Sequence, residues 1–497
     1  MPFQRSMFAS STLSHPSTAW SPMFIGMGFC TAVLLAFMAA DPACRHWFVI
    51  PVLICGFLVS RDAFDWLLGR RDLLDPIGVV GTFSLYFFFL TPLLHVMTGY
   101  WMLYVTPPDD WRPWLGVAAI LNCFGLAIYR VVVGRSAQEK HKPRYVWRLR
   151  KKPFWILLIG TGIVSLALEA YVNTRLGGVS GQIDSYMYSL VSHQDPLVNM
   201  GWIVVVSESF PVLMMLGVLV RLRERRQPPS LWTCVLMLVL LLGVQFFFGG
   251  FRGSRANTVW AVVWAVGALH LSVRRFGRMS ILVGLLGIFF FIYLAGFYKE
   301  SGAGALGVFQ GDEQRNLISS KSHRDVAAML LGDFARSDVQ AFTVYRMVAF
   351  PDMSDPALGR TYLGDICLLI PRVFWPDRWP GKAKWTTELE YGIGSYGIQR
   401  SSRIYGLLGE AMLNFGPWVA PGIFILLGLA VVNVQRWLWS LDRQDSRIFL
   451  IPFAVLLCTL LLIFDLDNLI WVAVKFAAIP SAIVALSSVR ILRPGPS

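Results

Sequence analysis

Long uncharged apolar stretches alternate with short polar segments along most of the chain. An α-helix needs about 20 apolar residues, within a range of about 17–25, to cross the roughly 30 Å of hydrocarbon in a bilayer. The pattern therefore predicts twelve membrane-spanning helices, at residues 23–40, 46–60, 77–95, 114–133, 154–172, 200–220, 231–248, 256–273, 280–298, 413–435, 448–464 and 469–489.

These segments predict an all-α polytopic membrane protein with three parts. Residues 1–298 hold helices one to nine, 299–403 form a large periplasmic loop with short membrane-surface helices, and 404–497 hold helices ten to twelve. The second span is short, and an interfacial helix is the alternative there. The tenth contains Pro417 and Pro421, which predict a kinked or broken helix because proline removes a backbone donor.

Composition excludes a soluble enzyme. Of the 497 residues, 55% are hydrophobic and only 15% are charged, whereas about a quarter are charged in soluble domains. The net charge of +14 comes from Lys and Arg spread between apolar runs rather than gathered in one patch, so no nucleic-acid partner is predicted. The seven cysteines show no ligand spacing, and nucleotide-binding and metalloprotease motifs are missing from the sequence, so we expect no cofactor or metal.

The loops predict the orientation, because Lys and Arg accumulate in short cytoplasmic loops. Residues 135–152 contain eight basic side chains against a single acid, Glu139. Threading the twelve spans places this segment on the same side as the other basic clusters, which include Arg61, Arg70, Arg71, Arg221, Arg223, Arg225, Arg226, Arg274, Arg275, Arg278, Arg436, Arg443, Arg447, Arg490 and Arg493. Both termini are then cytoplasmic. A cleaved signal peptide within residues 1–40 is the competing interpretation, although no clear cleavage site follows the apolar run.

Two loops on the opposite, periplasmic side are also basic, which the rule for cytoplasmic loops does not predict. One is the turn 249–255, which places Arg252 and Arg255 among three glycines, and the other is the segment 299–403. Arginine matches phosphate oxygens with paired hydrogen bonds, and Arg255 would begin a helix whose amide groups favour an anion. The turn therefore predicts a site for a lipid-linked phosphate or pyrophosphate. Two alternatives stay open: arginines that reach lipid headgroups, and a long loop that is translocated whatever its charge.

The long loop contains a short apolar piece, Ile366–Ile370, followed by Arg372 and Lys382. It is too short to span, so we expect it to dip into the membrane or lie along its surface. The tryptophans that follow, Trp375, Trp379 and Trp385, fit an interfacial aromatic belt, and a sugar-stacking platform is the alternative.

Glu410 is the main candidate for acid–base chemistry. Helical spacing would place it on one face with Arg403, seven residues earlier. A carboxylate there could accept a proton from an attacking hydroxyl while arginines hold a departing phosphate. Alternatively, Glu410 only balances the charge of Arg403. Ionisable residues also occur within or at the ends of spans, and either a cavity or a structural ion pair explains them; these are Glu169, Glu208, Asp465, Asp467 and Lys475.

The order of these features resembles the Wzy-type polymerases of O-antigen and other oligosaccharide repeat units. The resemblance lies in three stretches: FFGGFRGSR ending at Arg255, GRTYLGDICLLIPRVFWPDRWPGK at 359–382, and RIYGLLGEAMLNFGPWVAPGIFILLG at 403–428. It covers roughly the C-terminal half of the chain. It implies a metal-independent inverting glycosyltransferase of a bacterial inner membrane, which polymerises undecaprenyl-pyrophosphate-linked oligosaccharide repeat units into a surface polysaccharide at the periplasmic face.

The resemblance also implies roles for particular residues. Glu410 would be the general base, with Arg255 and Arg372 as the other catalytic residues, and the pyrophosphate would be bound by Arg252, Arg255, Arg372, Lys382 and Arg403. Four other residues of the outer loop could serve as the base instead: Asp365, Glu388, Glu390 and His323. Expected partners are the lipid-linked oligosaccharide, membrane lipids, a chain-length regulator and a flippase.

Three other functions fit the sequence, one of which is a structural partner of a polysaccharide assembly complex with no activity of its own. An O-antigen ligase would use the same donor with a different acceptor. A lipid-linked oligosaccharide flippase or other transporter would also have twelve spans and intramembrane charges, but its charges should concentrate near the bilayer midplane.

Overall fold

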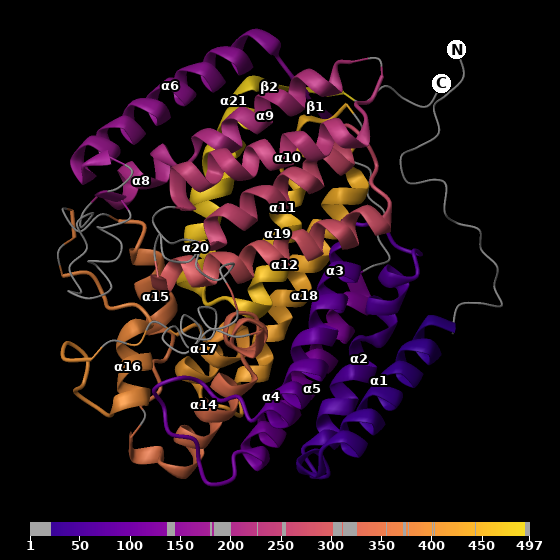
Figure 1. Cartoon of the computed structure of the whole chain (residues 1–497), viewed down its shortest axis with the longest axis vertical. Coiled ribbons are helices and arrows are strands. Elements are labelled where there is room, and N and C mark those ends of the chain that lie inside the picture. The colour runs from indigo at the N-terminus through magenta and orange to yellow at the C-terminus, as the bar shows by residue number, and fades with distance from the viewer. Residues whose placement is uncertain are drawn as a thin grey trace. The chain divides into compact units, whose positions relative to one another are not determined.

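The chain is mostly helical in the computed structural model (Figure 1). The structure describes residues 21–136, 145–178, 181–182, 200–225, 227–250, 255–301, 311, 326–353, 355–370, 374–375, 377–399, 401, 403–442 and 444–492. Of residues 21, 255–257, 297–301 and 353 it describes the backbone alone.

The described residues form two compact units, each assembled from separate stretches of chain. One unit comprises Met1–His141, Leu330–Trp439 and Leu457–Ile470, and the other comprises Lys142–Met329, Ser440–Leu456 and Trp471–Ser497. We call them unit 1 and unit 2. The loop predicted between the ninth and tenth spans is therefore divided, and most of its described residues belong to unit 1.

Unit 1 is a bundle of helices. Its elements are α1 (Ser21–Ala40), α2 (Val49–Leu67), α3 (Pro76–Leu85), α4 (Thr91–Thr98), α5 (Arg112–Ser136), α14 (Ser337–Ala349), α15 (Arg360–Cys367), α16 (Ala383–Tyr391), α17 (Gly406–Phe415) and most of α18 (Phe424–Ser440). Parts of α19 (Ile451–Ile463) and α20 (Leu466–Val472) complete it.

Unit 2 contains the remaining helices and a small sheet. Its elements are β1 (Tyr145–Leu149), α6 (Lys151–Leu176), α8 (Gly201–Ser207), α9 (Phe210–Arg223), α10 (Leu231–Gln245), α11 (Arg255–Ser272), α12 (Arg278–Ser301), α21 (Ile479–Ser487) and β2 (Ser488–Leu492).

Nine helical segments among the described residues are long and apolar enough to cross a membrane, as expected of a polytopic membrane protein. They are Pro22–Ala40, Pro76–Thr98, Arg112–Arg135, Lys151–Leu176, Gly201–Arg223, Leu231–Gly250, Arg278–Gly296, Ala420–Ser440 and Leu466–Ser487. Each coincides with one of the twelve predicted segments.

The other three predicted segments differ from a full span for identifiable reasons. The helix α2 continues beyond residue 60 through Arg61, Asp62 and Asp65, so three charged residues lie in its second half. The segments Thr258–Ser272 and Ile451–Ile463 are apolar but shorter than the others.

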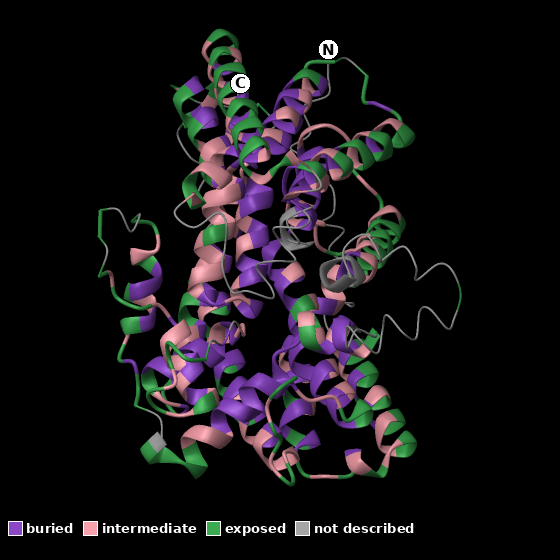
Figure 2. Cartoon of the chain, turned by 60° about the vertical axis from the view of Figure 1, so that its left-hand side comes forward, coloured by how far each residue is buried: buried purple, intermediate pink, exposed green. Residues whose placement is uncertain are grey.

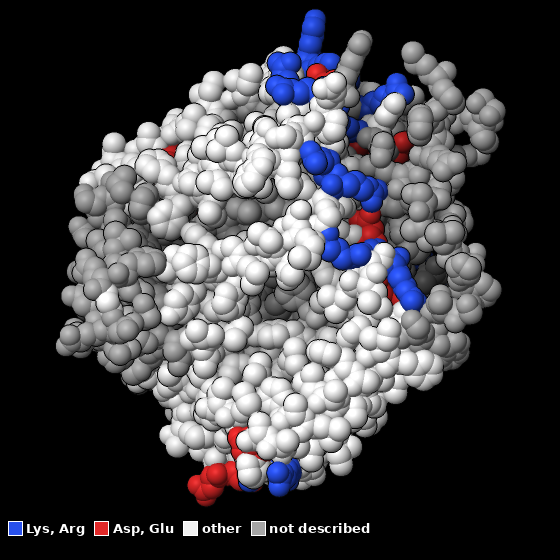
Figure 3. All heavy atoms as spheres, turned by 45° about the vertical axis from the view of Figure 1, so that its right-hand side comes forward, with Lys and Arg blue, Asp and Glu red and all other residues white. Residues whose placement is uncertain are grey.

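Apolar side chains are exposed along several of the long helices, where the surrounding solvent of a membrane protein is lipid. Phe24 on α1 and Leu286 on α12 are each 62% exposed. Figure 2 shows exposed and buried residues alternating around such helices. On the face drawn in Figure 3, uncharged side chains cover most of the described surface. These exposed apolar positions are what lipid contact requires.

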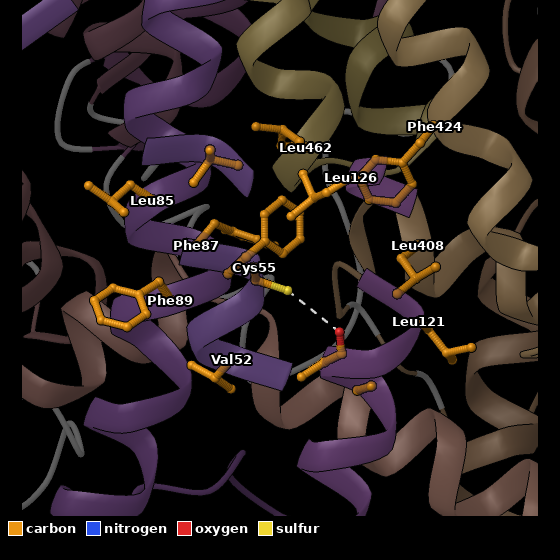
Figure 4. Packing of buried hydrophobic residues seen from close by; sticks show 14 of the residues in the cluster. Val52, Cys55, Leu85, Phe87, Phe89, Leu121, Leu126, Leu408, Phe424 and Leu462 are labelled. Carbon is orange, nitrogen blue, oxygen red and sulfur yellow. Dashed lines mark hydrogen bonds between the residues drawn. The ribbon is translucent and has the colours of Figure 1, made fainter. Parts of the chain in front are cut away.

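The core of unit 1 is formed by apolar side chains from helices far apart in sequence. Phe87, Phe89, Leu126, Phe424 and Leu462 are all buried in one cluster (Figure 4). The thiol of a buried cysteine on α2 also lies in it, 3.5 Å from a backbone oxygen of α5. Interdigitated packing of this kind fixes the relative positions of α2, α5, α17 and α18.

The helix α14 lies in the predicted periplasmic loop, but it packs into the bundle of unit 1. Its residues from Ser337 to Val344 are buried. The Asn122 amide of α5 donates to Gln340 Oε1 at 2.9 Å, and Thr91 Oγ1 lies 2.7 Å from Ser337 Oγ. Polar groups buried among helices need such partners. The loop segment therefore contributes to the bundle itself.

The break predicted at the tenth span is confirmed. The helix α17 ends at Phe415, Gly416 has a φ of +77°, and α18 begins at Phe424 after a 3₁₀ turn at Ala420–Ile423. Because α17 precedes the span Ala420–Ser440, Glu410 lies outside the membrane-spanning part of this segment.

The structure corrects the purely helical prediction at one place. Strands β1 and β2 form a two-stranded antiparallel sheet, with Tyr145 paired to Leu492 and Leu149 paired to Ser488. The guanidinium groups of Arg447 and Arg490 lie over the Trp147 ring. Residues 145–149 and 488–492, far apart in sequence, are thus paired directly.

Candidate functional site

A cluster of buried ionisable side chains lies in unit 1, beside the ends of several helices. The carboxyl-bearing residues Asp365, Glu410 and Asp465 are each no more than 3% exposed, and Lys382 is 5% exposed. They come from α15, α17, the α19–α20 junction and the residue before α16. Charged groups are rarely buried unless they are paired and hydrogen-bonded, so this acidic cluster is the strongest candidate site among the described residues of unit 1.

Asp465 occupies the N-terminus of α17. Its Oδ1 accepts hydrogen bonds from the backbone N–H groups of Tyr405, at 2.9 Å, and Gly406, at 2.6 Å. The Lys382 ammonium donates to its other oxygen and lies 3.2 Å from Asp467 Oδ1. The first N–H groups of a helix lack partners within the helix and carry partial positive charge. Asp465 therefore joins the start of α17 to the Lys382 side chain.

Glu410 performs the reciprocal role at the N-terminus of α20. Its Oε2 accepts from the backbone N–H of Leu466 at 2.7 Å, and its Oε1 accepts from the Thr361 hydroxyl at 3.1 Å. Asn414, one turn further along α17, donates to Thr361 Oγ1 at 2.6 Å and accepts from the Gly359 N–H at 3.0 Å. Asp465, which precedes α20, therefore caps the N-terminus of α17, and Glu410, which lies on α17, caps the N-terminus of α20. The Thr361 hydrogen bond to Glu410 joins α15 to α17.

Asp365 is held between the backbone of Lys382 and the Glu410 carboxyl. Its Oδ1 accepts from the Lys382 N–H at 3.2 Å, and the nearby Glu410 carboxyl lowers its pKa as a hydrogen-bond donor would. Burial and the nearby Asp467 carboxylate raise the pKa of Asp365 from 3.8 to about 6. Burial, together with the charges of Asp465 and Asp365, raises the pKa of Glu410 further.

The charges around Lys382 set which groups carry protons. Burial disfavours the Lys382 ammonium, but Asp465 and Asp467 outweigh that effect and raise the Lys382 pKa. Burial also raises the pKa of Asp465, against Lys382 and the backbone N–H groups, which favour its charged form. With more carboxyls than cations in a buried space, the pKa values of both Glu410 and Asp365 are raised, so the pair favours binding a proton. Such a pair can accept and return one proton, which is what general acid–base chemistry needs.

The cation in the acidic cluster is a side chain of the protein, the Lys382 ammonium. Within the described residues, no three His, Cys, Asp or Glu side chains are grouped to hold a metal ion. The Lys382 ammonium contacts both Asp465 and Asp467, and the Asp465 charge also acts on the buried Arg336 guanidinium. Lys382 was predicted to bind pyrophosphate, and in this arrangement its charge is already matched by carboxylates.

Arg403, the other predicted pyrophosphate ligand described here, lies outside α17. Because the helix begins at Gly406, the expected shared face of Arg403 and Glu410 does not form, and that prediction was wrong. Arg403 Nε instead lies 3.2 Å from Glu390 Oε1, and the guanidinium donates to the Leu103 carbonyl. The left-handed φ of Gly406, +72°, is what separates the two segments.

Glu390 organises a second polar group beside the acidic cluster. Its Oε1 accepts from the Ser401 hydroxyl at 2.7 Å and from the Tyr405 hydroxyl at 3.0 Å. Tyr405 is fully buried, and its backbone N–H donates to Asp465. It therefore links the Glu390–Arg403 pair to the acidic cluster through one residue.

The remaining predicted site residues cannot be placed from their side chains. Arg252 and Arg372 lie outside the described residues, as does His323, and Arg255 is described only as the first residue of α11. Glu388 is half-buried on α16.

Of the charges predicted within spans, Lys475 and Glu208 of unit 2 form an ion pair, with Glu208 2% exposed. The ion-pair interpretation of these two residues is the one the structure supports.

Sequence reasoning missed the hydroxyl and amide groups that hold the carboxyls. Thr361, Asn414 and Tyr405 are each fully buried polar side chains. One signal was present: Thr361 and Asp365 are four residues apart, as are Glu410 and Asn414, so each pair shares a helix face.

The α15 helix approaches the 380–382 segment so closely that only glycine fits at position 364. A Cβ on Gly364 would lie 2.3 Å from the Pro380 carbonyl oxygen and 2.8 Å from Gly381 Cα. We expect Gly364→Ala to lower the free energy of unfolding by about 1–3 kcal/mol, because the backbone must shift. Denaturant titration in detergent measures it. Gly422→Ala is the matched control, since no atom lies within 4 Å of its Cβ, and equal stability of both variants would contradict the prediction.

The raised pKa of Asp365 predicts a pH dependence of stability. The folded chain binds this proton more tightly than the unfolded chain, so the stabilising effect of the protonated group is lost as the pH rises from about 4 to about 6. The difference between 3.8 and about 6 corresponds to about 3 kcal/mol. Over this range the wild-type chain should lose stability relative to Asp365→Asn.

Unfolding titrations at pH 4, 5, 6 and 7.5 test this expectation. Asp365→Asn should become the more stable protein above pH 6, because the amide needs no proton to stay neutral. Glu388→Gln, on the neighbouring helix, should follow the wild-type curve. Parallel curves for wild type and Asp365→Asn would show that Asp365 titrates normally.

No protein-family model, no curated protein and no solved structure matches the chain.

Proposed function

We propose that this chain is a membrane glycosyltransferase that polymerises polyprenyl-pyrophosphate-linked oligosaccharide repeat units into a surface polysaccharide. The observation that carries the proposal is the buried Asp365–Glu410 carboxyl pair beside Lys382, outside the membrane-spanning segments and bonded to the helices that enter them. The nine apolar segments suit a substrate held in a membrane. The substrate class, lipid-linked oligosaccharide, comes from the resemblance of the three sequence stretches to repeat-unit polymerases.

The chemistry needs a base and a way to stabilise the leaving group. In an inverting transfer, the acceptor hydroxyl attacks the anomeric carbon of the donor sugar and loses its proton to a carboxylate. A glycosidic C–O bond forms, and the bond from that carbon to the pyrophosphate oxygen breaks with its electron pair on the pyrophosphate. The departing lipid pyrophosphate then needs cationic groups.

We assign the base to Asp365 rather than to Glu410. A base must be ionised at the working pH, and a pKa of about 6 leaves Asp365 ionised near neutral pH. Burial and the charges of Asp465 and Asp365 raise the pKa of Glu410 well above its ordinary value, which favours its neutral form. Glu410 would then donate a hydrogen bond to Asp365 and hold it in place, while Lys382 balances Asp465 and Asp467.

We assign the binding of the departing pyrophosphate to the arginines of the sequence motifs. Arg252, Arg255, Arg372 and Arg403 stay the candidates, because guanidinium groups remain charged and bind phosphate oxygens in pairs. Lys382 is placed as a positioning residue of the acidic cluster instead, since carboxylates already surround its ammonium.

The product made in cells tests this function. Surface polysaccharide is separated by gel from the source bacterium without this chain and from the same strain carrying wild type or Arg255→Ala, with membrane abundance checked by immunoblot. A polymerase predicts single repeat units in the deletion, long chains with wild type, and single units with Arg255→Ala at normal abundance.

Two outcomes would replace the proposal. If long polymer persists in the deletion but stays on its lipid carrier, the chain is a ligase. If lipid-linked units accumulate on the cytoplasmic side, it is a transporter, the function that the Glu208–Lys475 pair within the spans would favour.

A further inference from the structure

The helix α15 has its polar and apolar faces reversed relative to a helix of a soluble protein. Thr361 is fully buried and Asp365 is 1% exposed, and both point into the acidic cluster, where they contact Glu410 and Lys382. On the same helix Leu363 is 47% exposed and Ile366 is 51% exposed. A helix with its polar side chains inward and its apolar side chains outward is placed correctly only if its outer surroundings are apolar.

The exposed apolar surface continues beyond the helix. Leu369, Ile370 and Phe374, which follow it in the chain, are 38%, 39% and 80% exposed. Together with Leu363 and Ile366 they form what we call the α15 ridge. Water would disfavour such a run of large apolar side chains.

A neighbouring segment of the same chain, residues 415–420, indicates the depth of this surface relative to the membrane. The span Ala420–Ser440 begins immediately after Trp418 and Val419, which are 70% and 65% exposed. The Phe415 ring lies 6.2 Å from the Tyr362 ring of α15. Since residues just before a span lie at the membrane boundary, this contact holds α15 at the same level.

The groups that follow α15 are those typical of a membrane interface. Arg378 Nη1 donates to the Leu368 carbonyl at 3.4 Å and the Ile370 carbonyl at 3.1 Å, so the guanidinium satisfies backbone groups left open at the end of the helix. The rings of Trp375 and Trp379 lie 6.4 Å apart. Arginine and tryptophan hold apolar segments at the headgroup level.

We propose that α15 lies in the membrane surface, with the α15 ridge in the hydrocarbon of the bilayer, and so holds Asp365 at the level of the lipid headgroups. The occupant of the ridge is bilayer lipid, because α15 contacts Phe415 through Tyr362, and Phe415 lies five residues before a membrane-spanning segment. For the proposed function, on which this consequence rests, the substrate would reach Asp365 while its polyprenyl chain stays in the membrane. The sugar acceptor and donor are then both lipid-borne rather than free in solution.

Nitroxide labels measure the surroundings of α15 directly. The seven cysteines are free, and all but Cys123 and Cys367 are buried, so a Cys123→Ala/Cys367→Ala background of the full chain accepts a label at one introduced cysteine. Ile366→Cys places it on the α15 ridge. Ile398→Cys is the control, because it is 86% exposed in the irregular segment 392–399, whose open backbone groups require water.

The labelled proteins are placed in lipid nanodiscs, and collision rates with molecular oxygen and with a water-soluble nickel chelate are measured. Oxygen concentrates in hydrocarbon, so at Ile366 it should relax the label severalfold more than the nickel chelate does. At Ile398 the order should be reversed. Leu363→Cys, on the same face, repeats the test if Ile366→Cys elutes as an aggregate.

Two results would overturn the inference. Greater access for the nickel chelate at both ridge positions would place α15 in water, and low access for both reagents would mean that a protein surface covers the ridge. The measurement does not depend on activity. A lipid-exposed α15 in a chain that makes no polymer would keep this inference and remove the proposed function.

Discussion

Lys382→Met is expected to lower the free energy of unfolding by about 3–5 kcal/mol, because it leaves buried carboxylates without their cation. Asp465 is fully buried, and Lys382 contacts both it and Asp467. Methionine fills a similar volume, so the loss is mainly electrostatic. Purified protein in detergent, unfolded with denaturant and followed by far-ultraviolet circular dichroism, provides the measurement.

Two further variants separate this effect from packing. Lys384→Met removes an ammonium two residues away that lies over the Trp385 ring, and its effect should stay below about 1 kcal/mol, as for exposed charges. The double variant Lys382→Met/Asp465→Asn should recover part of the loss, since the amide oxygen still accepts from Tyr405 and Gly406. Additive effects of the two substitutions would contradict a direct interaction.

Much of the fold was predictable because hydropathy over 20 residues is a strong local signal. All nine long apolar segments coincide with predicted spans, and the prolines at 417 and 421 correctly indicated the break before α18. The segment 46–60, for which an interfacial helix is the alternative, shows the limit of that signal. Its apolar stretch continues as a helix through Arg61, Asp62 and Asp65, and Asp62 pairs there with Arg71 and Arg130, partners that lie on other elements.

The site was predictable only in part, because its contacts join residues far apart in sequence. Glu410 and Asp365 were candidates from their residue type and setting. Their pairing depends on α15 lying against α17, and the bond from Glu410 to the Leu466 N–H spans 56 residues. The predicted Arg403–Glu410 face failed for a local reason, since it assumed a helix that starts only at Gly406.

The acidic cluster can stabilise the fold through Asp465 and Glu410, which cap two helices, and still leave Asp365 available as a reactive carboxyl. Asp465 and Glu410 satisfy the N-termini of α17 and α20, so removing either loses a cap and a charge partner together. Asp365 accepts one backbone hydrogen bond, from Lys382, whereas Glu410 accepts from both the Leu466 N–H and the Thr361 hydroxyl. Asp365 is therefore the carboxyl of the cluster that can change with the smallest loss of structure, and the best residue at which to separate catalysis from folding.

Asp365→Asn is expected to lower the initial rate of glycan transfer by about 10²–10⁴-fold, the usual contribution of a general base. The substrate would be purified lipid-linked repeat unit in nanodiscs at pH 7.5, with chain length read by gel. Because the amide keeps the shape of the carboxyl and needs no proton, the variant should fold at least as stably as the wild type at this pH.

This combination of lost transfer and retained stability distinguishes catalysis from folding, which the loss of activity alone would not. The wild-type rate should also rise tenfold per pH unit below about 6, because only ionised Asp365 accepts the proton. Glu388→Gln should retain the wild-type rate and pH profile. A wild-type rate in Asp365→Asn, together with loss of transfer in a folded Glu410→Gln variant, would return the role of base to Glu410.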